Sequence, residues 1–483
     1  MTPFPPGTTL SADPSLQVRD RGRLLLGGAP MRIIRVSESG ATVVRSWLEG
    51  RPVADAPGAV GLARRLTAAG MLHPHPPGPT DAPPPGWSEV VTVVIPVRDD
   101  PDGLDLTLDR LGRSREPATG PPVTVVDDGS VVPVADRSGI RLLRRAVAGG
   151  PGVARQDALD DGVPTPLVAF VDAGVAVTAD QLRRLARWFD DPAVVAVAPR
   201  VATSDHDHPL TAYERDHSPL DLGGAPSPVG PGRMVSYLPT ACLLARTGAV
   251  VAAGGFDPAL RYGEDVDLVW RLAGRGEIRY DPSVVVHHPA RPTLRALLAQ
   301  RLAYGRSAAP LAARHGSAVA PIRLSRWSLA IWLLALTGRP AGALALAGVS
   351  GSLLRRKLAP VVPDSGGEAA RLVAIGHWWA GRHLADTAVR AWWPLTVAAL
   401  LARPTRAVAA RLVAWAWIRR LVGSSGGVEA RLRRLALEVL DDAAYGAGVW
   451  QGAWHQRSIR CLLPVLAEWP GDRPLDGGPP TDR

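Results

Sequence analysis

The residues best suited to chemistry in this sequence are three carboxylates near position 265. Glu264, Asp265 and Asp267 follow a glycine-rich turn, Gly254-Gly255-Phe256-Asp257, and open an apolar-periodic segment that is typical of a helix. Carboxylates in the first turn of a helix are favoured by its dipole, so one interpretation is a simple cap. A carboxylate held in a fixed position can also take a proton from a hydroxyl group, which makes it a general base.

A second group of polar residues follows predicted strands earlier in the chain. Residues 90–97 form a continuous apolar run of the kind buried on both faces of a sheet, and Pro96 ends it. Residues 123–126 form the next strand, and Asp127-Asp128-Gly129-Ser130 follow it directly. Ligands of open α/β sheets bind at the carboxyl ends of the strands. This segment is therefore a candidate ligand loop, although its composition is also good turn chemistry.

Strands and helices alternate from residue 90 onward, which predicts a mostly parallel sheet. Residues 202–233 interrupt this alternation with a long polar stretch rich in proline and glycine, which we expect to be a functional loop. Its run Asp205-His206-Asp207-His208 is interpreted as solvated, because no rigid element would fix the geometry of a metal site there. The remaining expected helices and strands cover residues 104–111, 167–171, 178–189, 194–201, 235–246 and 283–286.

These segments occur together in a known family. Ile95-Pro96-Val97-Arg98 ends the first strand, the Asp-Asp-Gly-Ser loop follows the second, and Gly152-Val153-Ala154-Arg155 comes at the expected distance. With the later Gly-Gly-Phe-Asp turn and the Glu-Asp pair, they resemble the family 2 glycosyltransferases. The resemblance implies an α/β fold of the GT-A type, with a mixed, mostly parallel sheet, whose first half binds a nucleotide sugar.

The resemblance also implies roles for individual residues. Asp265 would be the catalytic base, and Glu264 or Asp267 would orient it or contact the acceptor. The residues that would bind the nucleotide sugar are Pro96, Val97, Arg98, Asp127, Asp128, Arg155 and Asp172, with Arg155 approaching the diphosphate. The residues that would bind the acceptor are Tyr237, Thr240, Gly254, Gly255, Phe256 and Trp270.

The predicted strand 167–171 ends in Asp172-Ala173-Gly174, where the family has Asp-x-Asp. In the family those carboxylates hold Mg²⁺ or Mn²⁺ against the diphosphate, since hard cations prefer oxygen ligands. Gly174 takes the place of the second carboxylate here. A metal would then be held by Asp172 with His288, or its neighbour His287, where related enzymes place a third ligand. The alternative is a purely structural histidine beside a proline.

The first part of the chain, residues 15–73, is predicted to be a small module of its own. A short strand and glycine turn are expected near residues 18–28, followed by helices over 37–49 and 59–69, with Ser37 as N-cap. The pattern indicates a winged-helix-like domain and resembles the peptide-recognition domains of ribosomal-peptide modification systems. An accessory domain without a ligand is the alternative. A Pro-rich linker, residues 74–88, separates it from the glycosyltransferase domain, residues 89–316.

The last part, residues 317–470, is predicted to be helical and is rich in tryptophan and arginine. Residues 327–354 are strongly apolar, but Arg339-Pro340 cuts them into pieces shorter than the roughly 20 residues that span a bilayer. Residues 391–402 and 408–421 combine tryptophan with arginine, as interfacial helices do. We therefore expect this helical region to bind the cytosolic surface of the membrane. The alternative is a soluble helical bundle.

The composition excludes several classes of protein. The net charge is +10, yet Lys357 is the single lysine among 55 basic residues, and no basic stretch is interleaved with aromatic residues. Nucleic acid is therefore not an expected partner. Cys242 and Cys461 lie far apart and predict neither a disulfide framework nor a zinc site. The first ten residues lack the basic and apolar regions of a signal peptide, so a cytoplasmic location is expected.

Over nearly its whole length the chain resembles the mycofactocin-system glycosyltransferases, including residues 20–28 (DRGRLLLGG) and 220–223 (LDLG). This resemblance implies transfer of glucose from UDP-glucose, with inversion, to a peptide-derived redox cofactor precursor, and extension to a β-1,4-linked oligosaccharide. One alternative is a membrane glycosyltransferase acting on a lipid or cell-wall polysaccharide. Another is a degenerate nucleotide- or peptide-binding module without turnover, suggested by Gly174.

Overall fold

A computed structural model describes residues 2–78, 89–113, 120–204 and 209–467. Contacts divide the chain into two compact units, Met1–Pro292 and Thr293–Arg483. The finer division at residues 15–73, 74–88, 89–316 and 317–470 stays a prediction. The run from Asp205 to His208 and most of the Pro-rich linker lie outside the described residues, so their interpretation rests on the sequence alone.

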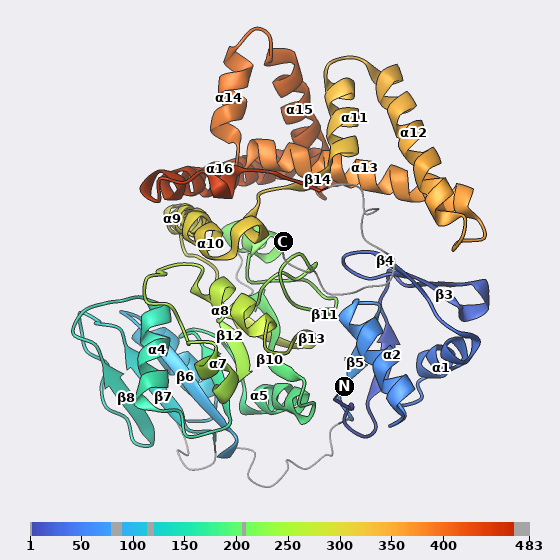
Figure 1. The fold of residues 1–483 in the computed structure, drawn as a ribbon. Helices are drawn as coiled ribbons and strands as arrows, with labels where there is room; N and C mark the ends of the chain where they lie inside the picture. The colour runs from blue at the N-terminus through green and yellow to red at the C-terminus, as the bar shows by residue number, and fades with distance from the viewer. Residues whose placement is uncertain (1, 79–88, 114–119, 205–208, 468–483) are drawn as a thin grey trace. The chain divides into compact units, whose positions relative to one another are not determined.

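A mixed eight-stranded sheet forms the centre of the first unit (Figure 1). Its strand order is β11-β13-β10-β12-β9-β6-β7-β8, and all of these strands except β11 and β12 point the same way. The predicted GT-A type of sheet, mixed and mostly parallel, is thereby confirmed. The strands are β6 Val91–Val97, β7 Val123–Asp127, β8 Ile140–Arg144, β9 Leu167–Val171, β10 Val194–Thr203, β11 Ser227–Pro228, β12 Cys242–Arg246 and β13 Glu277–His288.

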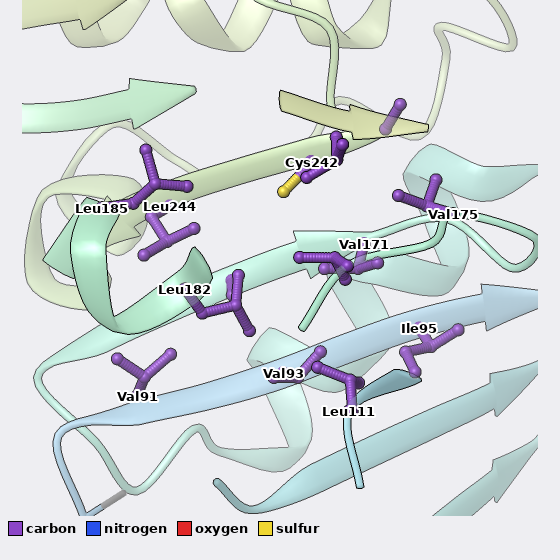
Figure 2. Packing of buried hydrophobic residues seen from close by; sticks show 14 of the residues in the cluster. Val91, Val93, Ile95, Leu111, Val171, Val175, Leu182, Leu185, Cys242 and Leu244 are labelled. Carbon is purple, nitrogen blue, oxygen red and sulfur yellow. The ribbon is translucent and has the colours of Figure 1, made fainter. Parts of the chain in front are cut away.

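The central strands are buried on both faces, which explains their unbroken apolar sequences. Val91, Val93 and Ile95 of β6 point into one core together with Leu182 of α5 (Figure 2). Val94, between them in sequence, packs into the core on the opposite face. Because side chains alternate along a strand, a continuous apolar run is what a strand between two helical layers requires.

Helices cover each face of this sheet. On the face of Val93 lie α3 Pro101–Arg110 and α5 Ala179–Ala186. The opposite face carries α4 Pro151–Asp161, α7 Thr247–Ala252 and α8 Glu264–Ala273. Thr178 caps α5 through a reciprocal pair of hydrogen bonds with Gln181, as its position before an apolar-periodic run predicts.

The N-terminal module has the predicted helices and a small antiparallel sheet. Ser37 caps α1 by accepting a hydrogen bond from the Gly40 amide, and Trp47 is buried in the core of the module. A further antiparallel pair joins β1 to β5, bringing residues 9–12 into contact with residues 72–75. The elements are β1 Thr9–Ala12, β2 Gln17–Arg19, β3 Leu24–Gly27, β4 Arg32–Arg35, α1 Glu38–Leu48, α2 Pro57–Ala68 and β5 Leu72–His75.

One arginine of this module makes a buried contact with the sheet domain. The guanidinium of Arg64, on α2, donates two hydrogen bonds of 2.7 and 2.8 Å to the carboxylate of Asp191. Its Nη1 also lies 3.4 Å from Glu277. Both side chains of the Arg64–Asp191 pair are about nine-tenths buried. Such a two-bond pair fixes orientation as well as distance, so it holds α2 against the turn that precedes β10.

The described part of the stretch 202–233 contains regular elements, and this corrects the expectation of a long loop. It contains α6, Pro209–His217, and the short strand β11. Leu210 and Tyr213 are buried, and the Tyr213 ring stacks on His217 one turn later, at 4.3 Å between centroids. Apolar contacts of this kind stabilise a short helix whose sequence alone favours turns.

Residues 293–467 of the second unit, the part that the structure describes, are mainly helical and contain a short parallel pair, β14 Arg323–Ser325 with β15 Val465–Ala467. Figure 1 shows α11 with α12 and α14 with α15 as two hairpins. Ion pairs join its helices, among them the buried pair of Arg301 with Asp441 at 2.7 Å and the pair of the partly exposed Arg390 with Asp442, also at 2.7 Å. The helices are α9 Leu294–Arg306, α10 Ala308–His315, α11 Arg326–Leu336, α12 Pro340–Leu358, α13 Ser365–Val389, α14 Trp393–Leu401, α15 Arg406–Gly423 and α16 Val428–His455.

Among the described residues, every helix is too short or too polar to cross a bilayer. The break predicted at Arg339-Pro340 falls between α11 and α12, as expected from the sequence. Cys242 and Cys461 are both buried and free.

Replacing Arg64 with methionine should lower the free energy of unfolding by about 3–5 kcal/mol, because Asp191 would stay buried without its cation. Urea unfolding of both proteins measures this difference. Arg65→Met is the matched control, since Arg65 is exposed on the same helix and should change stability by at most about 0.5 kcal/mol. Equal stability of the two variants would show that the buried pair contributes little.

Candidate active site

The carboxyl ends of β6, β7 and β9 meet at one edge of the sheet, and the predicted nucleotide-binding residues lie there. Val97 pairs with Asp127 across the strands, and the amide of Asp128 donates to the Val97 carbonyl at 2.9 Å. Pro96 and Val97 are buried, whereas Arg98 is exposed and lies 3.4 Å from Asp99. The structure thus brings Pro96, Val97, Asp127 and Asp128 into one loop cluster.

The carboxylate of Asp127 shapes its own loop. It accepts from the amides of Ser130 and Val134 at 2.9 and 3.0 Å. Burial favours the protonated carboxyl, but these hydrogen bonds outweigh it and hold the pKa of Asp127 below its ordinary value. The Asp127 carboxylate therefore stays ionised and holds the Asp-Asp-Gly-Ser turn in place.

Asp128 joins this loop to the start of α4. Its two oxygens accept from the amides of Gly149 and Gly150 at 2.8 and 2.7 Å, and Arg145 lies 3.0 Å from it. Gly150 has a positive φ of 94°, which a glycine adopts without strain. The resulting turn starts a helix whose N-terminal amides are suited to bind phosphate groups.

Arg155, on α4, connects the two halves of the site. Its Nη2 donates to Asp172 at the end of β9, and its Nη1 donates to Glu264 at the start of α8, 3.2 Å away. The side chain is 2% exposed, and its Nε has no hydrogen-bond partner. Burial disfavours the charge, but Asp172 and Glu264 outweigh it and raise the pKa of Arg155. This buried cation therefore stays charged and holds both carboxylates.

Close packing of α4 against α8 makes this bridge possible. A methyl group on Gly152 would come within 2.9 Å of the Glu264 side chain, so only glycine fits there. Phe256 lies on the other side of Arg155, with the guanidinium carbon 5.6 Å from the ring centroid. The same ring meets Phe170 edge-on at 5.0 Å. The site is thus built on packed side chains rather than on loops alone.

Asp265 is next to this bridge and keeps part of its surface exposed. Burial, followed by the negative charge of Glu264, raises the pKa of Asp265 from 3.8 to about 7. Burial likewise raises the pKa of Glu264, against the opposing effect of Arg155. A carboxyl that titrates near neutrality is well suited to take a proton from a substrate hydroxyl.

Asp267 has a different environment. Its carboxylate is buried and accepts from Arg271, one turn later, at 2.9 Å from Nε and 2.6 Å from Nη2. Arg271 also donates to the carbonyls of Ala253 and Gly255, which belong to the turn before the helix. The geometry gives Asp267 a positioning role, and its predicted catalytic role stays a prediction.

The predicted acceptor residues lie around this turn. A methyl group on Gly255, whose φ is +63°, would collide with Gln156, and the amide of Phe256 donates to Gln156 at 2.7 Å. Trp270 is partly buried, and its indole donates to the Ser236 carbonyl at 2.6 Å. Tyr237 donates to the Pro219 carbonyl at 3.0 Å, and Thr240 is buried. Their contact with an acceptor stays a prediction.

Metal binding rests on few donors. The described residues contain no group of three histidine, cysteine or carboxylate ligands that could hold a metal ion. Asp172 has 32% of its side chain exposed. His287 pairs with Ala176 in an isolated β-bridge, and His288 is the next residue. The Nδ1 of His288 lies 2.8 Å from the Pro289 carbonyl. A proton on Nδ1 would leave Nε2 free to bind a metal, the tautomer that ligating histidines favour.

Four positioning residues were missed by sequence reasoning: Asp99, Arg145, Gln156 and Arg271. The Asp267–Arg271 pair could have been found, since residues four apart on a helix face each other. The other three act across loops. The side chain of Asp99, for example, accepts from the Val131 amide at 2.7 Å, a contact that no local pattern indicates.

Comparison with known proteins identifies the class. The sequence profile described as Glycosyl transferase family 2 matches residues 92–237, which hold the nucleotide-side motifs. The protein is therefore an enzyme, a family 2 glycosyltransferase of the GT-A fold. Two curated relatives, from the CDC 1551 and H37Rv strains of Mycobacterium tuberculosis, are each named pre-mycofactocin glycosyltransferase. Each is 37% identical over 96% of this chain and 99% of its own length, and the chain belongs to their family.

Solved structures show only distant similarity. A mannosyltransferase from Pyrobaculum calidifontis is 18% identical, covers 72% of this chain and 92% of its own, and has a TM-score of 0.34. This similarity carries no information about ligands, so the residue roles rest on the geometry described above.

The raised pKa of Asp265 has a consequence for stability. The native state binds its proton up to about pH 7, whereas the unfolded chain loses it near pH 3.8. The stability that this group contributes is therefore present below about pH 4 and is lost as the pH rises through 7. Replacing Asp265 with asparagine should remove this loss, so the variant should gain stability relative to wild type as the pH rises from 5 to about 8.

Thermal unfolding of both proteins across this pH range measures the effect. Asp55→Asn is the control, since Asp55 is exposed and its substitution should change stability little. A difference between Asp265→Asn and wild type that stays constant with pH would contradict the raised pKa of Asp265.

Proposed function

We propose that this enzyme transfers glucose from UDP-glucose, with inversion, to a peptide-derived precursor of a redox cofactor, and extends the product to a β-1,4-linked oligosaccharide. The name of the relatives, pre-mycofactocin glycosyltransferase, supports the acceptor. The observation that carries the chemistry is the place of Asp265 in the first turn of α8, beside the Arg155–Glu264 pair, where burial and the charge of Glu264 raise its pKa to about 7.

The reaction needs one proton transfer and one displacement. Asp265 would accept the proton of the acceptor hydroxyl. At the same time the oxygen of that hydroxyl would form a bond to the anomeric carbon of the donor. The bond from that carbon to the diphosphate breaks, and the electron pair leaves with UDP. Attack opposite the leaving group inverts the anomeric configuration. Glu264 remains next to the base, where its charge raises the pKa of Asp265 and so strengthens it.

The electrostatics of the site favour a cation on the diphosphate side. Asp172, Glu264 and Asp265 surround a single buried cation, Arg155, and a diphosphate adds further negative charge. Asp172 and the Nε2 of His288 are the donors present, and Mg²⁺ commonly needs only one or two protein ligands when a phosphate supplies the rest. When bound, Mg²⁺ or Mn²⁺ would neutralise charge on the leaving UDP.

The test is UDP release from UDP-glucose with premycofactocin present, for wild type and Asp265→Asn, with Mg²⁺ and Mn²⁺ titrated from zero. We expect metal-dependent release by wild type and a loss of at least about 100-fold in the variant, the usual size of a general base effect. The wild-type kcat/KM should rise with pH up to about pH 7. Asp55→Asn should retain full activity.

Other outcomes would point elsewhere. Equal and negligible release by wild type and Asp265→Asn, with UDP still bound, would support the degenerate nucleotide-binding module. Release only with a lipid-linked acceptor would support the membrane glycosyltransferase acting on a lipid or cell-wall polysaccharide.

We also propose that the helical unit lies on an anionic membrane surface. Leu395 and Leu401 of α14 and Ile418 and Val422 of α15 are each more than half exposed. Arg403, in the turn between these two helices, is exposed as well. Exposed apolar side chains next to arginine are the combination that binds the interface of an anionic bilayer.

Flotation with vesicles tests this surface. Wild type should float with vesicles that contain phosphatidylglycerol and much less with pure phosphatidylcholine. Leu401→Ser should weaken binding by roughly tenfold, because one apolar side chain would no longer be buried in the bilayer. Val131→Ser, at an exposed valine of the first unit, is the control and should float like wild type. Indifference to lipid charge, or to Leu401→Ser, would contradict the proposal.

A further inference from the structure

A pocket of about 280 Å³ lies within the first unit, between the N-terminal module and the sheet domain. Ala68, the last residue of α2, lines it from the module. The sheet domain contributes the segment around Pro228, the residues after α8, and the start of β13. Val229, Ala273 and Ile278 make much of the lining apolar.

This pocket is separate from the sugar-transfer site. Ala273 lines it at the carboxyl end of α8, whereas Glu264 and Asp265 begin the same helix. A helix of 10 residues is about 15 Å long, so the pocket at one end of α8 lies about that far from the carboxylates at the other end. The proposed function therefore does not account for the pocket.

Arg279 is the unexplained residue in the lining. Its side chain is 3% exposed, and its Nη2 pairs with Glu277. Its Nε and Nη1 have no hydrogen-bond partner. A buried guanidinium with unused N–H donors is costly, because each unmet donor loses its hydrogen bonds to water. The cost falls when an acceptor binds these donors.

The other charges around the pocket favour an anion. Arg233 also lines it and donates to the Ala68 carbonyl at 2.6 Å. Burial, followed by the charges of Arg279 and Arg32, lowers the pKa of Arg233, which shows that the cations there repel one another. Glu277 is the acidic residue of the lining, and Arg64 and Arg279 already contact it. The lining therefore carries a net charge of about +1.

We propose that this pocket binds a carboxylate carried on an apolar stem, as at the carboxyl end of a peptide. The single surplus charge matches a monoanion, and Glu277 would repel a doubly charged phosphate. Arg279 would donate to the carboxylate, and the apolar lining would hold the stem. The ligand would contact both the module and the sheet domain. This proposal does not depend on the sugar-transfer reaction.

Isothermal titration calorimetry of the full-length protein tests the site, with three ligands: N-acetyl-L-valine, N-acetyl-L-valinamide and inorganic phosphate. We expect N-acetyl-L-valine to bind, and the uncharged amide and the phosphate to bind at least about tenfold more weakly. Arg279→Met should weaken binding of N-acetyl-L-valine at least about tenfold, the loss expected for a charged hydrogen bond.

Matched variants separate binding from folding. Arg110→Met removes an exposed charge on α3 and should bind like wild type. If Arg279→Met does not fold, Arg233→Met tests the same charge balance and should weaken binding by a smaller factor. A tripeptide that ends in valine should bind more tightly than N-acetyl-L-valine if a peptide is the natural ligand. Equal binding of acid and amide, preference for phosphate, or no binding by wild type would overturn the proposal.

Discussion

The buried guanidinium of Arg155 is the interaction on which the active site depends. It comes from α4, and it bonds to Asp172 after β9 and to Glu264 at the start of α8. These elements belong to the nucleotide side and the acceptor side of the domain. A charge with 2% of its side chain exposed is stable only while both carboxylates are in place. The helix α8 therefore cannot move away from α4 and β9 without leaving this cation exposed or without its carboxylate partners.

The same constraint explains the chemistry of Asp265. Glu264 is held by Arg155, so its negative charge stays next to Asp265 rather than turning to solvent. Burial and this neighbour both favour the protonated form of Asp265, which moves its titration to about pH 7. Arg155, for which we propose a place on the diphosphate side, thus also holds the neighbour that raises the pKa of the proposed base. Asp267, two residues later, has its own cation, since Arg271 pairs with it at 2.6 Å.

Local sequence patterns predicted six of the eight strands of the central sheet, many helices and the family motifs, because these depend on apolar periodicity and short-range capping. The strands β8 and β11 were not predicted. Ser37 and Thr178 cap their helices as predicted. The helix α6 was missed since it is stabilised by buried Leu210 and Tyr213, which no local pattern indicates. The Arg155 bridge spans 109 residues to Glu264, and the Arg64–Asp191 pair spans 127. Contacts between residues so far apart in sequence depend on the order of the strands in the sheet. The sequence indicates that order only through its resemblance to a known family.

The glycine at position 174 is a consequence of how its loop is built. Gly174 has a φ of +88°, and a methyl group there would lie 3.3 Å from the Pro289 ring. Its amide donates to the Gly103 carbonyl and to the Thr107 hydroxyl at 2.9 and 3.0 Å, which ties the loop to α3. A carboxylate at this position would therefore be strained and would displace the segment that carries His288. Gly174 and the Pro289 ring therefore pack closely, which leaves little room for a carboxylate at position 174. The same packing holds the segment of His287 and His288 against the loop that follows Asp172.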